Sequence, residues 1–427
     1  MRKLLLLVSA TILVIFLAGA QEMHPVLNKE VQTQLSGMSA ERLSRIDRTV
    51  QDYIDKHWLN GAIAIVCRNG KLAYYKGFGY DDPDKKTQMP KDGIFRIASQ
   101  TKAIVSTAVM ILYENGKLLL DDPVSKYIPE FSKQQVMDKF NENDSSYTTV
   151  PARRDITIRD LLTHTSGIGY PVIGTKEMQA IYSKNDIPSG LGNINANLLE
   201  KMKALGKLPL QFQPGEKWMY GLNTDLLGCL VEIISGMSLE EFIRKNVCEP
   251  LGMVDTYFNL PKEKAPRLLN VYTEDEQHHI VKWTEKDRKV DPNYPLADKH
   301  YFSGGAGLSS TAFDYAVFLQ MFLNGGIYNG HRILSRRSVE MMTSGQLSFP
   351  FNGTDNFGLG FGLVSAQGGA KGPWNQGTFE WGGYFGSSYW ADPKEKLICL
   401  FITQQNPNSH GDIGEKFKEL VYQSIEE

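Results

Sequence analysis

The sequence predicts an α+β fold, in which a largely antiparallel sheet is flanked by N- and C-terminal helices and interrupted by an all-helical domain. Three observations lead to this prediction. Runs of alternating, aromatic or β-branched residues that are typical of strands occur near both ends of the chain, at 61–80 and 377–405. Between them, residues 99–260 show helical spacing of apolar side chains. Amphipathic helices are expected outside the strands, at 39–58 and 411–427.

The composition is that of an ordinary globular protein. The chain has 427 residues, of which 42% are hydrophobic and 22% charged, which is enough to bury a large core. The formal net charge is −2, and nothing in the sequence resembles the basic face that neutralises phosphates. Nucleic-acid binding is therefore not expected.

Residues 1–20 predict a secretory signal peptide rather than a part of the fold. Arg2 and Lys3 precede an apolar run that ends in small residues at 18–20, which is the charge, apolar core and cleavage pattern of such signals. The alternative is a retained membrane anchor, but the apolar run is short for a membrane span. We therefore expect a periplasmic or secreted protein with no stable membrane span after removal of the signal.

The first expected element of the mature chain is the helix at 39–58, for which Ser39 is a candidate N-cap. The next stretch, 61–80, is interpreted as two strands joined at Asn69-Gly70. This dipeptide tolerates the positive φ angles that a tight type I′ turn requires, and so predicts a β-hairpin.

The middle of the chain predicts several helices separated by polar segments. One helix ends at Asn115-Gly116, a left-handed stop signal, and another begins at Thr157. The polar stretches 133–155 and 261–299 are interpreted as long surface loops or insertions.

The C-terminal strands are separated by a hairpin turn at 392–395 and followed by the closing helix. Together the elements predict a signal peptide at 1–20, an α/β domain formed by 21–98 and 300–427, and a mainly helical insertion domain of 99–299. The active site is expected at the interface of the two domains.

The four cysteines favour buried free thiols over a disulfide framework in a chain of this size. There is no C-x-x-C sequence and no paired histidine spacing of the kind that binds zinc. No metal site is expected.

The stretch 95–105, FRIASQTKAIV, places Ser99 where an apolar helix begins and Lys102 three residues later. Residues at i and i+3 share a helix face, so the two side chains can touch. A lysine that burial keeps neutral can remove the proton of a serine hydroxyl and make it a nucleophile. Free N–H groups at a helix N-terminus also suit an oxyanion. Taken alone, however, the pattern favours a helix cap followed by an exposed lysine.

Five segments in order change that interpretation. IFRIASQTKAIVSTAVMILYENGKLLLDDPVSKYIPEF resembles the serine β-lactamase and penicillin-binding-protein superfamily around its S-x-x-K motif. Four further segments resemble later landmarks of its class C β-lactamase-related branch. They are TIRDLLTHTSGIGY, FQPGEKWMYGLNTDLLGCLVEIISG, SGGAGLSSTAFDYAVFLQMFLNGG and WGGYFGSSYWADPKEKLICLF. The resemblance covers nearly all of residues 40–425 and implies a β-lactamase/transpeptidase-like fold.

The resemblance also implies roles for individual residues. Ser99 matches the nucleophile that becomes acylated, and Lys102 matches its base, acting alone or with a tyrosine that corresponds to Tyr220. A phenol needs a pKa well below about 10 to act as a base near neutrality, so an ammonium group close to Tyr220 is a chemical requirement. By position, the backbone N–H groups of Ser99 and Tyr384 would form the oxyanion hole.

Two motifs depart from the β-lactamases of this branch. Their Y-x-N is replaced by Tyr220-Gly221-Leu222, and their K-T-G by Trp381-Gly382-Gly383. The lysine of K-T-G helps to hold a substrate carboxylate, whereas tryptophan removes that cation and adds an aromatic wall. Both departures resemble the esterase members. Trp381, Gly382 and Gly383 are expected to bind substrate, since glycines let a backbone approach the acyl group.

The favoured function is a serine hydrolase that cleaves a small-molecule ester or amide through an acyl-serine intermediate, with carboxylesterase-type activity and no cofactor. The alternative is a β-lactamase, a D-Ala-D-Ala carboxypeptidase or a D-amino-acid peptidase. A second alternative is a non-catalytic binding protein on the same scaffold. The presence of all three expected catalytic residues, Ser99, Lys102 and Tyr220, argues against it. His164 is interpreted as structural, and the oligomeric state is left open.

Overall fold

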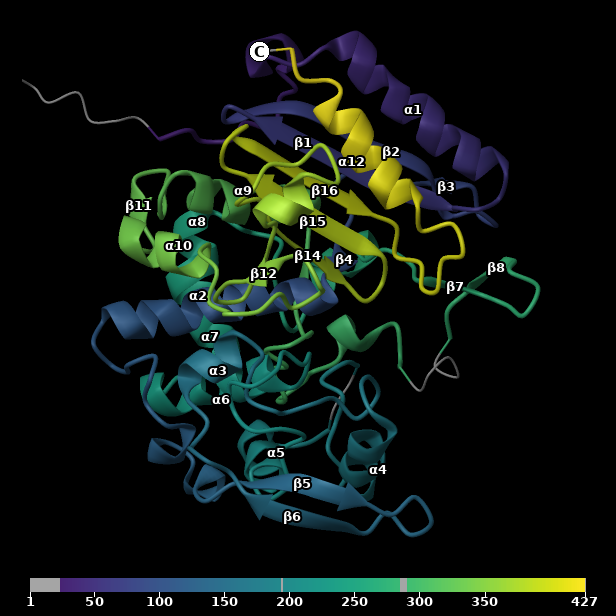
Figure 1. Ribbon diagram of the computed structural model, residues 1–427. Coiled ribbons are helices and arrows are strands. Elements are labelled where there is room, and N and C mark those ends of the chain that lie inside the picture. Colours follow the sequence, from purple (N-terminus) through teal and green to yellow (C-terminus); the bar gives the residue numbers. More distant parts are fainter. Residues whose placement is uncertain (1–23, 193–194, 285–289, 427) are drawn as a thin grey trace, which may run out of the picture.

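An eight-stranded antiparallel sheet forms the upper half of the computed structural model as drawn in Figure 1, and the model describes residues 24–192, 195–284 and 290–426. The spatial order of the strands is β12-β13-β14-β15-β16-β1-β2-β3. They are β1 (Gly61–Arg68), β2 (Lys71–Asp82), β3 (Thr87–Gln88), β12 (Asn356–Phe357), β13 (Gly362–Leu363), β14 (Phe379–Gly383), β15 (Ser387–Asp392) and β16 (Leu397–Ile402). Strands from both ends of the chain share one sheet, which confirms the predicted α+β fold.

The two terminal helices cover one face of this sheet (Figure 1). α1 (Ala40–Asp55) begins after Ser39, whose hydroxyl accepts a hydrogen bond from the N–H of Arg42, as predicted. α12 (Ile413–Tyr422) packs beside α1. The apolar faces of the two helices are buried against the sheet in a cluster that includes Ile46, Val50, Trp390, Phe417 and Val421.

Two hairpins fix the register of the central strands. β1 and β2 are joined at Asn69 and Gly70, whose φ angles of 52° and 70° are those that the predicted turn requires. β15 and β16 form the second predicted hairpin. β1 then pairs with β16, with Ile65 opposite Leu400, and this pairing joins the N-terminal strands to the C-terminal strands.

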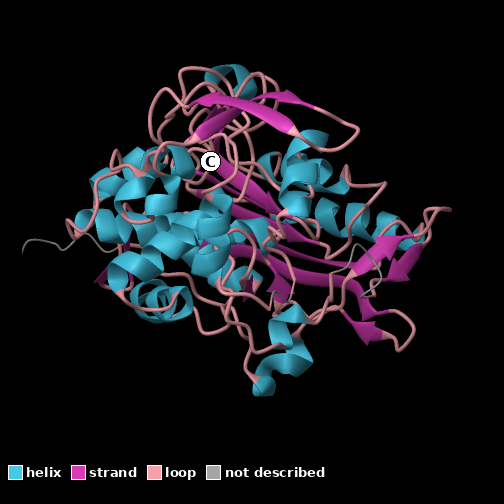
Figure 2. Ribbon diagram, turned by 90° about the horizontal axis from the view of Figure 1, so that it is seen from below, coloured by secondary structure: helices cyan, strands magenta, loops and turns pink. Residues whose placement is uncertain are grey.

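A buried helix, α2 (Thr101–Glu114) in Figure 1, lies between the sheet and the other helices of the middle of the chain. Figure 2 shows the helices and strands of the molecule from below. α2 is buried at every residue from Thr101 to Leu112. A helix that is covered on all sides is typical of a protein interior. α9 (Ala312–Leu323) packs against β1 and β16 on the same face of the sheet as α2, because residues of both helices share one apolar cluster with Ile63 and Ile65 of β1. α2 therefore carries Lys102 into the core.

Most of the other helices are short, and α3 begins at its predicted cap. Thr157 forms a capping box with Asp160 at the start of α3, and Asn115-Gly116 follows the end of α2. The remaining helices are α3 (Ile158–Leu162), α4 (Lys176–Lys184), α5 (Leu198–Leu205), α6 (Asn223–Ser235), α7 (Leu239–Ile243), α8 (Glu249–Leu251), α10 (Arg336–Met342) and α11 (Ala366–Gly369).

The stretches 133–155 and 261–299 are not loops throughout, and the helical insertion is therefore not all-helical. Each stretch carries a hairpin, formed by β5 (Gln135–Phe140) with β6 (Tyr147–Pro151) and by β7 (Tyr272–Glu274) with β8 (Ile280–Lys282). β6 is exposed along its whole length, so it lacks the apolar alternation that marks a half-buried strand. Two more small pairs are β4 (Phe95–Arg96) with β9 (Ser309–Ser310) and β10 (Ile327–Tyr328) with β11 (His331–Arg332).

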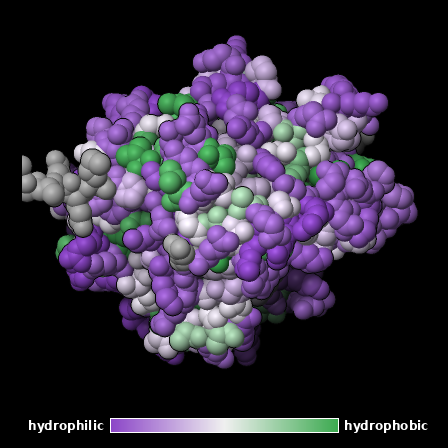
Figure 3. All heavy atoms as spheres, turned by 90° about the horizontal axis from the view of Figure 1, so that it is seen from above, coloured by the Kyte–Doolittle hydropathy of each residue, from purple (hydrophilic) through white to green (hydrophobic). Residues whose placement is uncertain are grey.

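All four cysteines are free and buried, as predicted. Hydrophilic side chains cover most of the face seen in Figure 3, where apolar atoms form small separate groups. Within the described residues, no helix has the length and apolar character that a membrane span needs. The signal peptide predicted at 1–20 lies outside the described residues. The assignment of domains to 21–98, 99–299 and 300–427 stays a prediction, although all strands of the main sheet fall in the first and last of these ranges.

Candidate active site

Ser99 lies in a short 3-10 turn, Ala98–Gln100, that leads directly into α2. Neither this turn nor α2 has a side-chain cap, so Ser99 does not cap the helix. The residue before it, Ala98, has a φ of 44°, a conformation that non-glycine residues rarely adopt and that recurs at functional sites. The backbone thus presents the Ser99 side chain at the end of a buried helix.

Lys102 is the partner that the S-x-x-K spacing predicts. Its side chain is 3% exposed, and its Nζ atom lies 3.3 Å from the Oγ atom of Ser99 and donates to the carbonyl oxygen of Gly305 at 2.8 Å. The i, i+3 relation therefore produces the contact that the mechanism requires, and the interpretation of Lys102 as an exposed lysine is wrong.

Tyr220 lies across the lysine from Ser99. Lys102 Nζ is 4.5 Å from the centre of the Tyr220 ring and 5.6 Å from that of Tyr170, so two aromatic faces surround the amine. The Tyr220 hydroxyl accepts a hydrogen bond from Nε1 of Trp381 at 3.3 Å. The tryptophan that stands in place of the K-T-G lysine thus contacts the predicted catalytic tyrosine directly.

The end of β14 approaches the Ser99 turn closely. A Cβ atom built on Gly383 would lie 2.6 Å from the carbonyl oxygen of Ile97, two residues before Ser99, so only glycine fits there. Tyr384 follows at once and lines the same cavities as Ser99. Gly382 and Trp381 precede it on the strand. The geometry brings together all the predicted site residues, whose catalytic and binding roles stay predictions.

Two cavities meet at Ser99. The first, which we call the β14 cavity, has a volume of about 590 Å³ and is bordered by Trp381, Glu380 and Lys418. The second, which we call the apolar cavity, has a volume of about 520 Å³. Its walls include Tyr170, Val172, Leu191, Val290 and Ala306. Four residues border both cavities: Ser99, Ile173, Tyr220 and Tyr384.

His164 supports the site from behind Tyr220 rather than entering it. The His164 ring centre is 5.1 Å from that of Tyr220, and its Nδ1 atom is 2.8 Å from Nδ2 of Asn223. Burial, together with the charge of Lys102, holds the pKa of His164 well below its usual range, so the ring is neutral. Asn223 also accepts a hydrogen bond from Ser166. The side chain of Asn223 is therefore bound to His164 and Ser166, and it does not replace the asparagine of Y-x-N.

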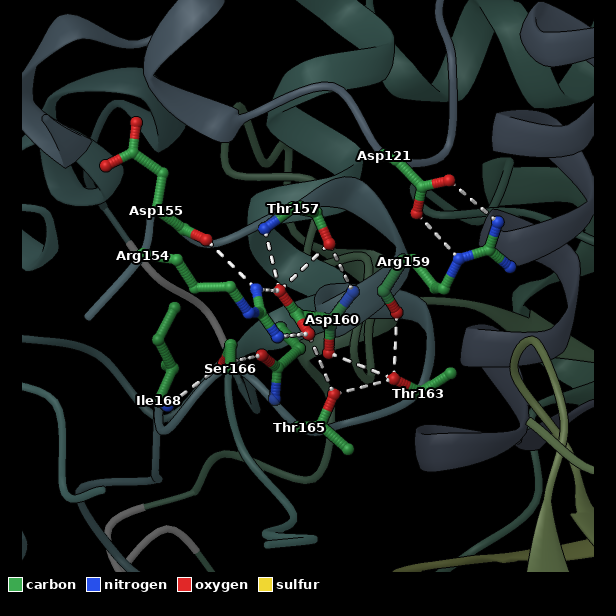
Figure 4. A network of polar contacts seen from close by, with 11 residues as sticks. Asp121, Arg154, Asp155, Thr157, Arg159, Asp160, Thr163, Thr165, Ser166 and Ile168 are labelled. Atoms are coloured by element: carbon green, nitrogen blue, oxygen red, sulfur yellow. Dashed lines mark hydrogen bonds and ion pairs between the residues drawn. The ribbon is translucent and has the colours of Figure 1, made fainter. Parts of the chain in front are cut away.

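A polar network fixes the turn that carries His164 (Figure 4). The buried Asp160 carboxylate accepts hydrogen bonds from the Arg154 guanidinium and from the Thr157 hydroxyl and N–H. Thr165 also donates to Asp160. A buried carboxylate with this many donors holds its surroundings in one arrangement. The network therefore holds in place the segment that carries His164, and the Tyr220 ring packs against the His164 ring.

Asp225 is a buried carboxylate close to Lys102 that the sequence analysis missed. It is 0% exposed and lies in the first turn of α6. A Cβ atom built on Gly305 would lie 2.4 Å from Asp225 Oδ2, so this carboxylate stands directly behind the residue whose carbonyl accepts from Lys102. Burial raises the pKa of Asp225 to about 6, although a hydrogen bond from Ser303 and the Lys102 charge act in the opposite direction.

Replacing Asp225 with asparagine is expected to stabilise the fold at neutral pH. The folded chain binds a proton at the Asp225 carboxylate more tightly than the unfolded chain does, because the pKa of an aspartate in the unfolded chain is about 3.9. Stability therefore falls as the pH rises from about 4 to about 6, and the whole penalty is present above pH 6. Asparagine cannot ionise, so Asp225→Asn is expected to gain up to about 3 kcal/mol at pH 7.5 and close to nothing at pH 4. Urea unfolding at the two pH values measures the difference.

The matched control is Asp84→Asn, which removes an exposed aspartate on the turn after β2. Its free energy of unfolding is expected to change by less than about 0.5 kcal/mol at either pH. If Asp225→Asn were no more stable than the wild type at pH 7.5, the carboxylate would not carry a burial penalty.

Several other aromatic, histidine and lysine side chains of the described residues make no hydrogen bond with Ser99 or Lys102. Trp390 and Tyr389 are 1% exposed and belong mainly to the core of the sheet. His278 and His279 are exposed in the β7–β8 turn. Lys371 is exposed in a loop and borders neither cavity. It therefore does not replace the missing K-T-G lysine.

Gly305 and Tyr170 were also missed. Both come from loops that are distant in sequence from Ser99, and only folding brings them to Lys102. Asp225 did leave a signal, because a charged residue in the first turn of the apolar helix NTDLLGCLVEII is either paired or functional when it is buried. Among the described residues no cluster of histidine, cysteine and acidic side chains is suited to a metal ion.

Comparisons with known proteins match this architecture along most of the chain. The family described as Beta-lactamase matches residues 46–423. Protein Rv1367c of Mycobacterium tuberculosis is 34% identical over 84% of this chain and 89% of its own length, and esterase EstB of Burkholderia gladioli is 31% identical over 87% and 92%. Among solved structures, EstCE1, described as a hydrolase with promiscuous acyltransferase activity, has a TM-score of 0.77 at 24% identity, covering 91% of this chain and 99% of that chain.

Proposed function

The chain belongs to the beta-lactamase family and is a serine hydrolase of that fold; from this premise we propose that it is a carboxylesterase-type enzyme that works through an acyl-Ser99 intermediate. Lys102, with Tyr220, takes the proton of the Ser99 hydroxyl, and Oγ attacks the carbonyl carbon of the ester. The N–H groups of Ser99 and Tyr384 stabilise the oxyanion. The C–O bond to the alcohol then breaks, and the alcohol oxygen receives the proton.

The second half of the reaction uses the same groups in reverse. A water molecule gives its proton to Lys102 and Tyr220 and attacks the acyl carbon, which forms a second oxyanion. The bond to Ser99 Oγ breaks, Oγ regains a proton, and the carboxylic acid leaves. No redox step or additional group is required.

The observation that carries the ester assignment is the contact between Trp381 and Tyr220. The position that offers a cation to a substrate carboxylate in K-T-G enzymes is occupied by an indole, whose N–H is directed to the Tyr220 hydroxyl. Lys418 is the one cationic side chain among the described residues of the β14 cavity, and it lies 3.1 Å from Glu380 and 3.8 Å from Glu415. Lys418 is paired with these carboxylates on the face of β14 opposite to Trp381, so it does not replace the K-T-G lysine. The name of the relative EstB supports the same proposal.

A substrate panel tests the proposal. The purified protein is given p-nitrophenyl acetate, a chromogenic cephalosporin and a D-Ala-D-Ala peptide, and kcat/KM is compared. We expect kcat/KM for the ester to exceed that for the other two by about a hundredfold or more, since both of these carry a carboxylate that finds no free cation. Rapid hydrolysis of the cephalosporin or the peptide without turnover of the ester would favour the β-lactamase or peptidase alternative.

Export and binding partners form the rest of the proposal. The charge and cleavage pattern of residues 1–20 supports a periplasmic or secreted enzyme. The slightly negative net charge supports a small-molecule substrate and no nucleic-acid partner.

A further inference from the structure

The two cavities that meet at Ser99 differ in their charge. None of the described residues that line the apolar cavity is acidic, basic or a histidine. The β14 cavity, in contrast, is bordered by Glu380, Glu415 and Lys418. Glu380 and Trp381 are neighbours on β14, so their side chains point to opposite faces of the sheet, and Glu380 pairs with Lys418 on the face of α12. Near Ser99 the β14 cavity is therefore bordered by Trp381, Gly382 and Gly383, whereas the apolar cavity offers aliphatic and aromatic side chains.

The position of the Tyr220 hydroxyl distinguishes the two sides. This hydroxyl is hydrogen-bonded to Nε1 of Trp381, and Trp381 borders the β14 cavity and not the apolar cavity. A leaving alcohol needs a proton at its oxygen as the bond breaks, so its oxygen must lie within reach of the proton donor. The alcohol therefore leaves on the β14 side, and the acyl group occupies the other side.

We infer that the apolar cavity is the acyl site and that the preferred substrates are esters of medium-chain aliphatic acids; this assignment rests on the proposed ester hydrolysis. The cavity volume of about 520 Å³ lies in the range of sites that enclose a whole small ligand, which is far more than an acetyl group fills. Leu191, Val290 and Ala306 offer aliphatic contacts along it.

The rim of this cavity extends the apolar surface toward solvent. Val172 and Ile173 are 62% and 45% exposed and border the cavity mouth. Exposed apolar side chains are ordinary when single, but two in succession at a cavity entrance lengthen the surface on which an aliphatic chain can lie. Acyl chains of about eight carbons are therefore accommodated by the cavity and its rim.

A chain-length series tests the acyl assignment. p-Nitrophenyl esters from acetate to dodecanoate keep the leaving group constant, so only the acyl side changes. Each added methylene that leaves water for the cavity is expected to raise kcat/KM about fourfold, until the cavity is filled near eight carbons. A companion series of butyrate esters with lengthening alcohols is expected to vary by less than about threefold in total, because those chains extend past Gly382 and Gly383, which have no side chains to contact them. A steep rise in the alcohol series with a flat acyl series would reverse the assignment.

Leu191→Trp tests the same inference by filling the cavity. Leu191 borders the apolar cavity and not the β14 cavity. The variant is expected to lose at least about tenfold in kcat/KM on the octanoate ester and to stay within about twofold on the acetate ester. Leu119→Trp, the same substitution at a leucine that is 64% exposed beyond α2, is expected to leave both rates unchanged.

The outcomes separate this inference from the proposed function. If the wild type hydrolyses acetate and octanoate esters equally and Leu191→Trp lowers both rates alike, the acyl assignment fails while ester hydrolysis stands. If the wild type hydrolyses no ester in either series, the proposed function itself fails.

Discussion

Ser99→Ala is expected to lower ester hydrolysis by about 10⁴-fold or more while the protein remains folded. The reaction needs an oxygen atom at this position to form the acyl-enzyme, and no other hydroxyl is paired with Lys102 among the described residues. The side chain is only half-buried and caps neither the 3-10 turn nor α2, so alanine removes little structure. Initial rates on p-nitrophenyl acetate and a thermal melt of each variant measure the two effects.

Ser106→Ala provides the matched control. Ser106 is a buried serine further along the same helix and borders neither cavity. We expect this variant to hydrolyse the ester at the wild-type rate. A Ser99→Ala enzyme that kept a normal rate would disprove the proposed nucleophile.

A fluorophosphonate probe distinguishes an enzyme from a binding protein on the same scaffold. The probe phosphonylates a serine oxygen only where that oxygen is activated, with fluoride as the leaving group. We expect one adduct in the wild type, located on the peptide that contains Ser99, and none in Ser99→Ala. Folded wild-type protein without an adduct would favour the non-catalytic alternative.

The parts of the fold that the sequence predicted are those that local chemistry determines. The Asn69-Gly70 turn, the Ser39 cap and the Thr157 capping box each depend on a few adjacent residues, and each was found as predicted. The β5–β6 hairpin was missed because β6 is exposed, so the sequence shows no burial pattern there. Tertiary contacts hold it instead: the N–H of Met137 donates to the carbonyl of Leu210.

In the candidate site, too, the sequence could predict some contacts and not others. Ser99 and Lys102 are three residues apart on one helix, so the sequence could predict their contact. Gly305 contacts Lys102, and Asp225 packs against Gly305, only because α6 and a glycine-rich loop lie together. Gly304 is so close to Thr224 that a Cβ atom there would lie 2.2 Å from the Thr224 carbonyl oxygen. Contacts of that kind have no fixed sequence spacing. A sequence can therefore identify a nucleophile and its base before it identifies the groups that position them.

Lys102→Met is expected to lower kcat/KM for an alkyl ester by about 10³- to 10⁴-fold. Methionine fills a similar volume in the buried helix but cannot accept the Ser99 proton. The variant also loses the donor to Gly305, so a thermal melt is needed to show that it is folded. Titration with p-nitrophenyl acetate in a stopped-flow instrument measures the acylation step separately, as a burst of p-nitrophenolate.

The size of the loss is expected to depend on the leaving group. p-Nitrophenolate departs without being protonated, whereas an alkoxide must receive a proton from the Lys102 and Tyr220 pair. Lys102→Met is therefore expected to impair alkyl esters about tenfold more than p-nitrophenyl esters, because the alkyl reaction loses both the base and the acid. An arginine at position 102 carries a fixed positive charge and can neither accept nor release a proton, so Lys102→Arg is expected to resemble Lys102→Met rather than the wild type. Wild-type activity in Lys102→Arg would show that this residue supplies only charge, and Tyr220 alone would then be the base.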